Sequence, residues 1–196
     1  VYLGELYDGR LEQEGWDTAG FDDGKWSPAV VATEPIGAMK SQVQPPVKMM
    51  PTIKPVKISE PRPGMYIFDL GRNFAGWARL KVKGPAGTKV TLRYGELLYP
   101  DGMLNVMTSV AGQIKSAGTG GPGAPEVAWQ SDTYICKGDG DEVYMPRFTF
   151  HGFRYVEVTG YPGKPGPEAI EGVPLSAAVQ PVGTFSCSNT MFNRIQ

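Results

Sequence analysis

The chain has 196 residues, 41% of them hydrophobic, which is enough to bury a core in one domain or in one domain and part of a neighbour. The formal net charge is -1 with both signs interspersed, so there is no electrostatic case for nucleic acid or a membrane surface as a partner. No apolar run approaches the ~18–20 residues that a membrane span needs.

Turn-forming residues are dense and predict an all-β fold. Gly and Pro number 26 and 18, and the segments between them show strand-like alternation far more often than helical periodicity. The chain starts with VYLGELYDGR, which has neither the charged start nor the apolar core of a signal peptide and no initiator Met. We therefore expect that the native N-terminus is missing.

Residues 41–63 have a different composition, with spaced prolines and no glycine. Proline cannot donate a hydrogen bond to a central strand pairing, so this segment is expected to be an extended connector or an edge segment. We interpret it as the junction between two modules.

Short alternating runs in the middle of the chain predict β-strands. In Trp77–Lys83, the side chains of Ala78, Leu80 and Val82 share one face, and Lys89–Tyr94 alternates in the same way. The Gly-Pro turn between these runs predicts that they form a hairpin. Further strands are expected at Met65–Leu70, Thr133–Lys137, Arg147–Phe150 and Phe153–Thr159.

Two later segments differ from this pattern. Residues 102–131 are irregular and include a long Gly- and Pro-rich loop, and such loops are often functional or interfacial. At the end of the chain, Ser188 or Asn189 is suited to cap a helix whose apolar residues have helical spacing up to Ile195. We expect the start of a truncated helix here, and hence a fragment of a larger protein.

The single histidine, His151, lies at the break between two predicted strands. The chain has no second His and lacks the GxSxG, HExxH and Walker motifs, so we interpret His151 as structural, with a contact to a partner domain as the alternative. Cys136 and Cys187 are far apart and have no CxxC spacing, which argues against zinc. A disulfide between the two cysteines is left open.

Hydrolysis of a sugar needs two carboxyl groups about 5–10 Å apart, one of them with a shifted pKa. The acids at Asp101 and Asp139 are explained by Asp-Gly turns, and those at 22–23 lie between glycines in an expected solvated loop. No catalytic residue is therefore assigned. Trp16 and Trp26 flank this acidic loop and are the better candidates for stacking on a sugar ring.

Four segments in order along the chain match one known family. Residues 4–29 (GELYDGRLEQEGWDTAGFDDGKWSPA), 68–105 (FDLGRNFAGWARLKVKGPAGTKVTLRYGELLYPDGMLN), 131–163 (SDTYICKGDGDEVYMPRFTFHGFRYVEVTGYPG) and 182–196 (VGTFSCSNTMFNRIQ) carry the match. The first resembles the end of the N-terminal β-sandwich of bacterial α-L-rhamnosidases of glycoside hydrolase family 78. The next two resemble their concanavalin-like β-sandwich, and the last resembles the entry to their catalytic barrel.

The resemblance implies an all-β fold, an antiparallel β-sandwich of jelly-roll or concanavalin-like type. It also implies a division of the chain into a remnant of the preceding β-sandwich domain (1–40), a Pro-rich connector (41–63), the concanavalin-like sandwich (64–182) and the entry to the (α/α)6 catalytic domain (183–196).

In that family the parent enzyme hydrolyses terminal α-L-rhamnosyl groups with inversion, using carboxylates in the (α/α)6 barrel. No residue of this chain matches those catalytic motifs, so we expect an inactive fragment that supports and packs on its own barrel. His151 and Arg154 are the candidates for the domain interface. The resemblance is also consistent with a periplasmic or extracellular setting, which the sequence itself does not give.

The alternative from a different class is a carbohydrate-binding module for L-rhamnosides. Some family members carry a calcium-assisted rhamnose-binding sandwich upstream, and the first residues of this chain resemble its end. Glu5, Asp8, Arg10 and Trp16 would then form the site. No metal ligands are assigned, and calcium is the one cofactor left open.

Overall fold

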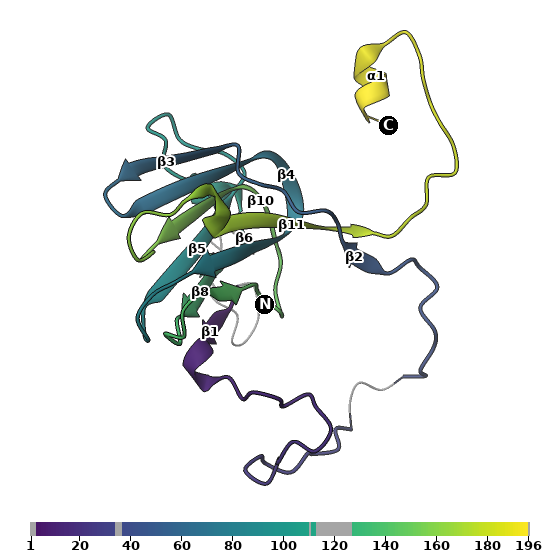
Figure 1. Ribbon diagram of the computed structural model, residues 1–196. Coiled ribbons are helices and arrows are strands. Elements are labelled where there is room, and N and C mark those ends of the chain that lie inside the picture. The colour runs from purple at the N-terminus through teal and green to yellow at the C-terminus, as the bar shows by residue number, and fades with distance from the viewer. Residues whose placement is uncertain (1–2, 34–36, 110, 113–126, 196) are drawn as a thin grey trace.

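The computed structural model describes residues 3–33, 37–109, 111–112 and 127–195. They form a curled, mostly antiparallel sheet with a few 3-10 turns and a short C-terminal helix (Figure 1). The strands are β1 Leu6–Asp8, β2 Val47–Met49, β3 Lys57–Arg62, β4 Met65–Val82, β5 Lys89–Gly95, β6 Ala111–Gly112, β7 Val127–Ala128, β8 Ser131–Ile135, β9 Glu142–Tyr144, β10 His151–Thr159 and β11 Ile170–Ala177, and the helix is α1 Thr190–Ile195. The main sheet has the order β1-β8-β5-β10-β4-β11-β2, with β3 and β9 also paired to β4.

The long strand β4 joins the two halves of the sheet. Its first residues, Met65–Asp69, lie between β3 and β10, its later residues Gly76–Leu80 pair with β11, and its end at Leu80–Val82 pairs with β9. The register between β4 and β10 shifts between Phe153 and Tyr155. Such a bulge bends and twists a strand pair, which lets one continuous sheet curl into two facing layers.

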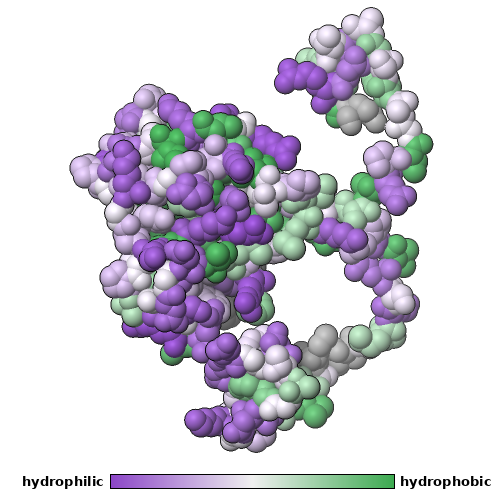
Figure 2. All heavy atoms as spheres, viewed as in Figure 1, coloured by the Kyte–Doolittle hydropathy of each residue, from purple (hydrophilic) through white to green (hydrophobic). Residues whose placement is uncertain are grey.

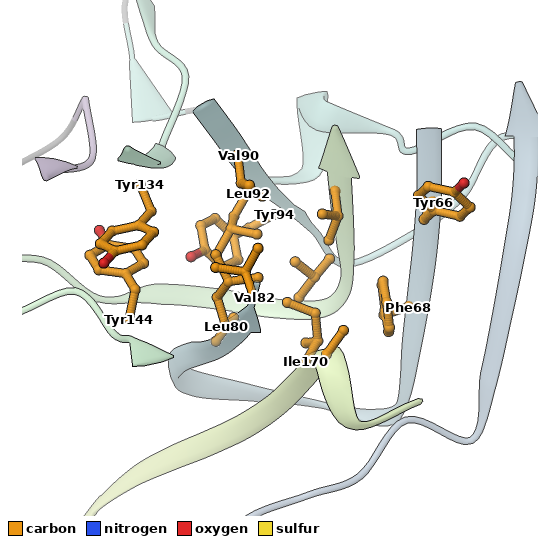
Figure 3. Packing of buried hydrophobic residues seen from close by; sticks show 14 of the residues in the cluster. Tyr66, Phe68, Leu80, Val82, Val90, Leu92, Tyr94, Tyr134, Tyr144 and Ile170 are labelled. Atoms are coloured by element: carbon orange, nitrogen blue, oxygen red, sulfur yellow. The ribbon is translucent and has the colours of Figure 1, made fainter. Parts of the chain in front are cut away.

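Inward-facing residues of the alternating strands fill the space between the layers. Leu80 and Val82 of β4 lie close to Val90 and Leu92 of β5, as Figure 3 shows. Each fully buried side chain of this kind contributes about 1.5–3 kcal/mol to folding. The buried cluster consists of Tyr66, Phe68, Leu70, Ala78, Leu80, Val82, Val90, Leu92, Tyr94, Tyr134, Cys136, Tyr144, Phe153, Val156, Val158, Ala169 and Ile170.

The prediction of an all-β sandwich is confirmed, but the predicted hairpin of Trp77–Lys83 and Lys89–Tyr94 is wrong. Strand β5 lies between β8 and β10 and does not pair with β4. The turn after Lys83 instead carries the chain from one layer to the other. The apolar faces of the two strands therefore meet across the core, where a hairpin would have placed them edge to edge.

Two local predictions at the end of the chain had different outcomes. Residues 147–150 are not a strand, and β10 runs without a break from His151 to Thr159. The predicted terminal helix is present, and Asn189 is its cap, because its Oδ1 accepts hydrogen bonds from the backbone N–H groups of Met191 and Phe192.

The N-terminal strand β1 belongs to the same sheet, where it pairs in parallel with β8. The segments 12–33 and 37–46 and the C-terminal tail 179–195 are exposed almost throughout and extend away from the sandwich body (Figure 2). The predicted domain boundaries at 40, 63 and 182 stay predictions. No helix in the described part of the chain is long and apolar enough to cross a membrane.

Candidate functional site

A groove of about 770 Å³ lies beside β1, and we call it the N-terminal groove. One wall comes from the segment 7–17, and the other from Lys137, Asp139 and Arg147. The parallel pairing of β1 with β8 brings these walls together, because it places the start of the chain next to the turn that follows β8.

The groove wall near β1 is ordered by an internal ion pair. Asp8 Oδ1 accepts from the backbone N–H of Arg10 at 3.0 Å and so caps the 3-10 turn Gly9–Leu11. The Arg10 side chain donates to both carboxylate oxygens of Asp8, at 2.9 and 2.7 Å. These side-chain hydrogen bonds lower the pKa of Asp8 and raise that of Arg10. The pair fixes the direction in which Arg10 extends.

A second polar chain crosses the groove. Lys137 Nζ donates to Glu12 Oε2 at 2.9 Å, and the Tyr7 hydroxyl donates to Glu12 Oε1 at 2.8 Å. The hydrogen bond from Lys137, followed in size by the one from Tyr7, lowers the pKa of Glu12. The pKa of Tyr7 is raised, mainly by burial and next by its hydrogen bond to Glu12. The Arg147 guanidinium lies 6.0 Å from the centroid of the Tyr7 ring. Glu12 is therefore held ionised, as a hydrogen-bond acceptor.

Trp16 supplies an aromatic surface in the groove. Its side chain is half exposed, and its backbone N–H donates to Gln13 O. Trp26 lies outside the groove, packs on Phe21 and donates through Nε1 to Gln13 Oε1 at 2.7 Å. An exposed indole beside fixed charged groups suits a sugar ring, which offers an apolar face and hydroxyl edges.

The structure therefore brings together part of the predicted sugar site. Arg10 and Trp16 line the groove, and Asp8, which does not line it, holds Arg10 through their ion pair. Glu5 does not line the groove, because its carboxylate accepts from the Tyr144 hydroxyl and from backbone N–H groups in the segment before β10. Glu5 thus holds the fold in place beside the groove.

Sequence reasoning missed the far wall of the groove. Lys137, Asp139 and Arg147 lie more than a hundred positions from Trp16 and reach it through the β1–β8 pairing. No local motif marks a parallel strand pair of this length. The acidic turn at 138–141 was a visible signal, but turn chemistry explained it.

The two candidate interface residues lie in different surroundings. His151 is 1% exposed, with Nε2 3.0 Å from Asp132 Oδ2 and Nδ1 3.3 Å from Gln130 Oε1. Arg154 is partly exposed and donates through Nε and Nη2 to Asp69, at 2.8 Å each. This favours the structural interpretation of His151, and the interface role of both residues stays a prediction.

Among the residues that the structure describes, no three His, Cys, Asp or Glu side chains come together as a metal-ligand set. The N-terminal groove is therefore not assigned a calcium ion. Cys136 and Cys187 are both free thiols, Cys136 in the core and Cys187 in the tail.

The fold and groove define a β-sandwich module with a polar surface site, and comparison with known proteins places it further. A model of the bacterial alpha-L-rhamnosidase concanavalin-like domain matches residues 59–176, and one of the alpha-L-rhamnosidase N-terminal domain matches residues 1–51. The chain belongs to the bacterial α-L-rhamnosidase family, and its sandwich is of the expected concanavalin-like type.

Individual relatives agree with this assignment. An alpha-L-rhamnosidase of Streptomyces avermitilis is 40% identical over 193 residues, which is 98% of this chain and 17% of the relative, and one of Formosa agariphila is 33% identical over 100% of the chain and 19% of the relative. The structure of alpha-L-rhamnosidase from Dictyoglumus thermophilum is 43% identical with a TM-score of 0.84, over 100% of this chain and 20% of that one. The Streptomyces avermitilis enzyme solved with L-rhamnose is 39% identical, also with a TM-score of 0.84. The chain thus spans about a fifth of the length of its relatives.

Proposed function

We propose that this chain is the non-catalytic β-sandwich part of an α-L-rhamnosidase, and that it supports and packs on a separate (α/α)6 barrel that hydrolyses terminal α-L-rhamnosyl groups. The observation that carries the proposal is the similarity to α-L-rhamnosidases along the whole chain, over about a fifth of their length.

The lowered pKa values of several carboxylates support a non-catalytic role for this chain. A glycosidase acid needs a raised pKa to hold its proton at neutral pH. Hydrogen bonds from Arg10, Lys137 and Arg154 lower the pKa of the carboxylates that they contact. Glu142 lies in the core, where burial raises its pKa, but bonds from the Tyr134 hydroxyl and two backbone N–H groups outweigh this effect. These groups act as acceptors, not as proton donors.

The test is the hydrolysis of an aryl α-L-rhamnoside by the purified chain, with a full-length relative as the positive control. We expect no release of the aryl alcohol by the chain at concentrations where the relative gives a strong signal. Turnover by the chain that survives repurification would overturn the proposal.

A second function is favoured by the presence of Arg10 and Trp16 in one groove. We propose that the N-terminal groove binds a rhamnosyl group, with the ring on Trp16. Calorimetric titration with L-rhamnose, with and without calcium and with galactose as the control sugar, tests this. We expect heat with rhamnose that Trp16→Ala abolishes and that Trp129→Ala, at an exposed indole outside the groove, retains. No heat from the folded wild type would leave the scaffold function alone.

A further inference from the structure

A closed ring of hydrogen bonds lies inside the sandwich, apart from the N-terminal groove. The Tyr94 hydroxyl donates to Asp132 Oδ2 at 2.5 Å, and His151 Nε2 contacts the same oxygen. His151 Nδ1 contacts Gln130 Oε1, Gln130 Nε2 donates to Ser109 O, and Ser109 Oγ donates to Tyr94 O. Tyr94 and His151 are each 1% exposed and Asp132 is 0% exposed.

The partners in the ring determine where hydrogens must lie. A carbonyl oxygen cannot donate, so the amide nitrogen of Gln130 has to face Ser109 O, and its Oε1 then faces His151. Nδ1 of His151 must therefore carry a hydrogen. Nε2 lies 3.0 Å from Asp132 Oδ2, and two lone pairs at that distance repel, so a second hydrogen lies between those atoms.

We propose that His151 and Asp132 form a buried imidazolium–carboxylate pair, and that this pair is a proton-dependent clamp on the segments that meet around it. The clamp holds β1 through Asp132 Oδ1, which accepts from the Glu5 backbone N–H at 2.9 Å. It also holds Gln130, which has a φ of 49°, a conformation that a non-glycine residue adopts at a cost. Through Gln130 it reaches Ser109, which follows the 3-10 turn Val106–Thr108 in the long connection between β5 and β8.

The other ionisable groups near His151 do not supply a charge in contact with its ring. The Tyr94 ring stacks on the imidazole at 4.0 Å, and burial, followed by the charge of Asp132, raises the pKa of Tyr94, which keeps it a neutral donor. Glu5 directs its carboxylate to the Tyr144 hydroxyl, and Glu96, near Gly152, accepts from Asn73. Asp132 is thus the anion in direct contact with the ring.

The consequence is a dependence on pH with a definite sign. A histidine in an unfolded chain gives up its proton near pH 6.5, about the value of the free side chain. The sign follows from the geometry, because removal of the hydrogen between Nε2 and Asp132 Oδ2 takes away the contact that closes the clamp. Loss of the proton would leave a buried carboxylate without its charged partner, which is strongly unfavourable.

The experiment is nitrogen-15 NMR of the imidazole in the whole chain, and the single histidine makes its signals unambiguous. We expect both ring nitrogens to carry hydrogen at about pH 7.5, above the ordinary range of histidine. A spectrum with one bare ring nitrogen at this pH would overturn the proposal, and this measurement needs no variant.

Two matched variants distinguish the effect of the charge of Asp132 from the effect of its size. Asp132→Asn keeps the size of the side chain and removes its charge, so the ring should lose one hydrogen at the same pH. Asp69→Asn removes a carboxylate that pairs with Arg154 and not with the imidazole, so it should leave the imidazole signals unchanged. Amide exchange at Glu5, compared with a β10 amide such as that of Val158, should accelerate between about pH 6.5 and pH 9 beyond its intrinsic base catalysis. Equal protection ratios at the two pH values would contradict the clamp.

Discussion

The Glu5 carboxylate ties the N-terminal strand to the segment before β10. It accepts from the Tyr144 hydroxyl at 3.0 Å and from the backbone N–H groups of Arg147 and Phe148 at 3.1 and 3.2 Å. An amide in its place would turn a donor toward at least one of these donors. These contacts connect two parts of the chain that lie about 140 positions apart.

We expect Glu5→Gln to lower the free energy of unfolding by about 1–3 kcal/mol, the usual cost of leaving such groups unsatisfied. Urea unfolding measures this, with Glu14→Gln as the control because Glu14 is exposed. Coincident midpoints for the two variants would show that the Glu5 contacts are not stabilising. Rhamnose binding by folded Glu5→Gln should equal that of the wild type, since Glu5 lies outside the groove.

The Asp69–Arg154 ion pair is expected to stabilise the fold at neutral pH and to lose this effect in acid. The hydrogen bonds from Arg154 lower the pKa of Asp69 against the opposing effect of burial, and the Gly71 N–H adds to this. A depressed folded-state pKa gives stability that is present above the unfolded value of about 3.9 and is lost as the pH falls through the folded value. Asp69→Asn should therefore cost about 1 kcal/mol at neutral pH, a modest amount because Arg154 is partly exposed.

The measurement compares urea midpoints of wild type and Asp69→Asn at about pH 6 and about pH 2.5, which lies below the ordinary range of aspartate. The difference between the urea midpoints of the two proteins should become smaller in acid. A gap of constant size would mean that the loss comes from shape and not from charge.

At the scale of elements, alternation in the sequence predicted which faces of the strands are buried but not which strands pair. The inward positions of β4 and β5 are as expected, whereas their neighbours in the sheet are not. Alternation has the same period in either arrangement, since it depends on which face is covered and not on which edge is occupied. For the same reason the sequence located Arg10 and Trp16 but not Lys137 and Arg147 across the groove.

Close strand contacts make Gly76 a sharp test of this topology. It lies in β4 opposite His151 of β10 and Pro174 of β11, and a Cβ there would be 2.2 Å from Val173 O. We expect Gly76→Ala to destabilise the fold by about 3 kcal/mol or more, because the backbone must move.

Gly152 on β10 is the matched control. A Cβ there meets nothing closer than Glu96 Oε1, at 3.8 Å. Gly152→Ala should therefore be neutral or slightly stabilising, by up to about 1 kcal/mol. Thermal unfolding of both variants checks the pair of expectations, and equal effects would contradict the register between β4 and β11.

At the scale of the whole molecule, the tail after β11 adds little to the sandwich. Residues 179–195 are exposed almost throughout, and α1 stands apart from the body (Figure 1). The side chains of Val182 and Phe192 are 100% and 54% exposed. Apolar groups on such a segment stabilise nothing until a partner covers them.

Removal of residues 180–196 should therefore shift the midpoint of thermal unfolding by less than about 2 °C, since no buried contact is lost. Differential scanning calorimetry measures this, with removal of 170–196, which deletes all of β11, as the control that should prevent folding. A large shift for the shorter deletion would place the tail against the sandwich in solution.

The pairing of β1 with β8 has a consequence for how this family exchanges parts in evolution. One family model ends at residue 51 and the other begins at residue 59, so β1 and β8, which pair with each other, lie on opposite sides of the boundary between the two matches. Recombination at that point would graft a sandwich without its own edge strand, and the incoming β1 would have to offer a glutamate at the position of Glu5. The two modules are therefore expected to be inherited together, and a chimaera should carry both from the same ancestor.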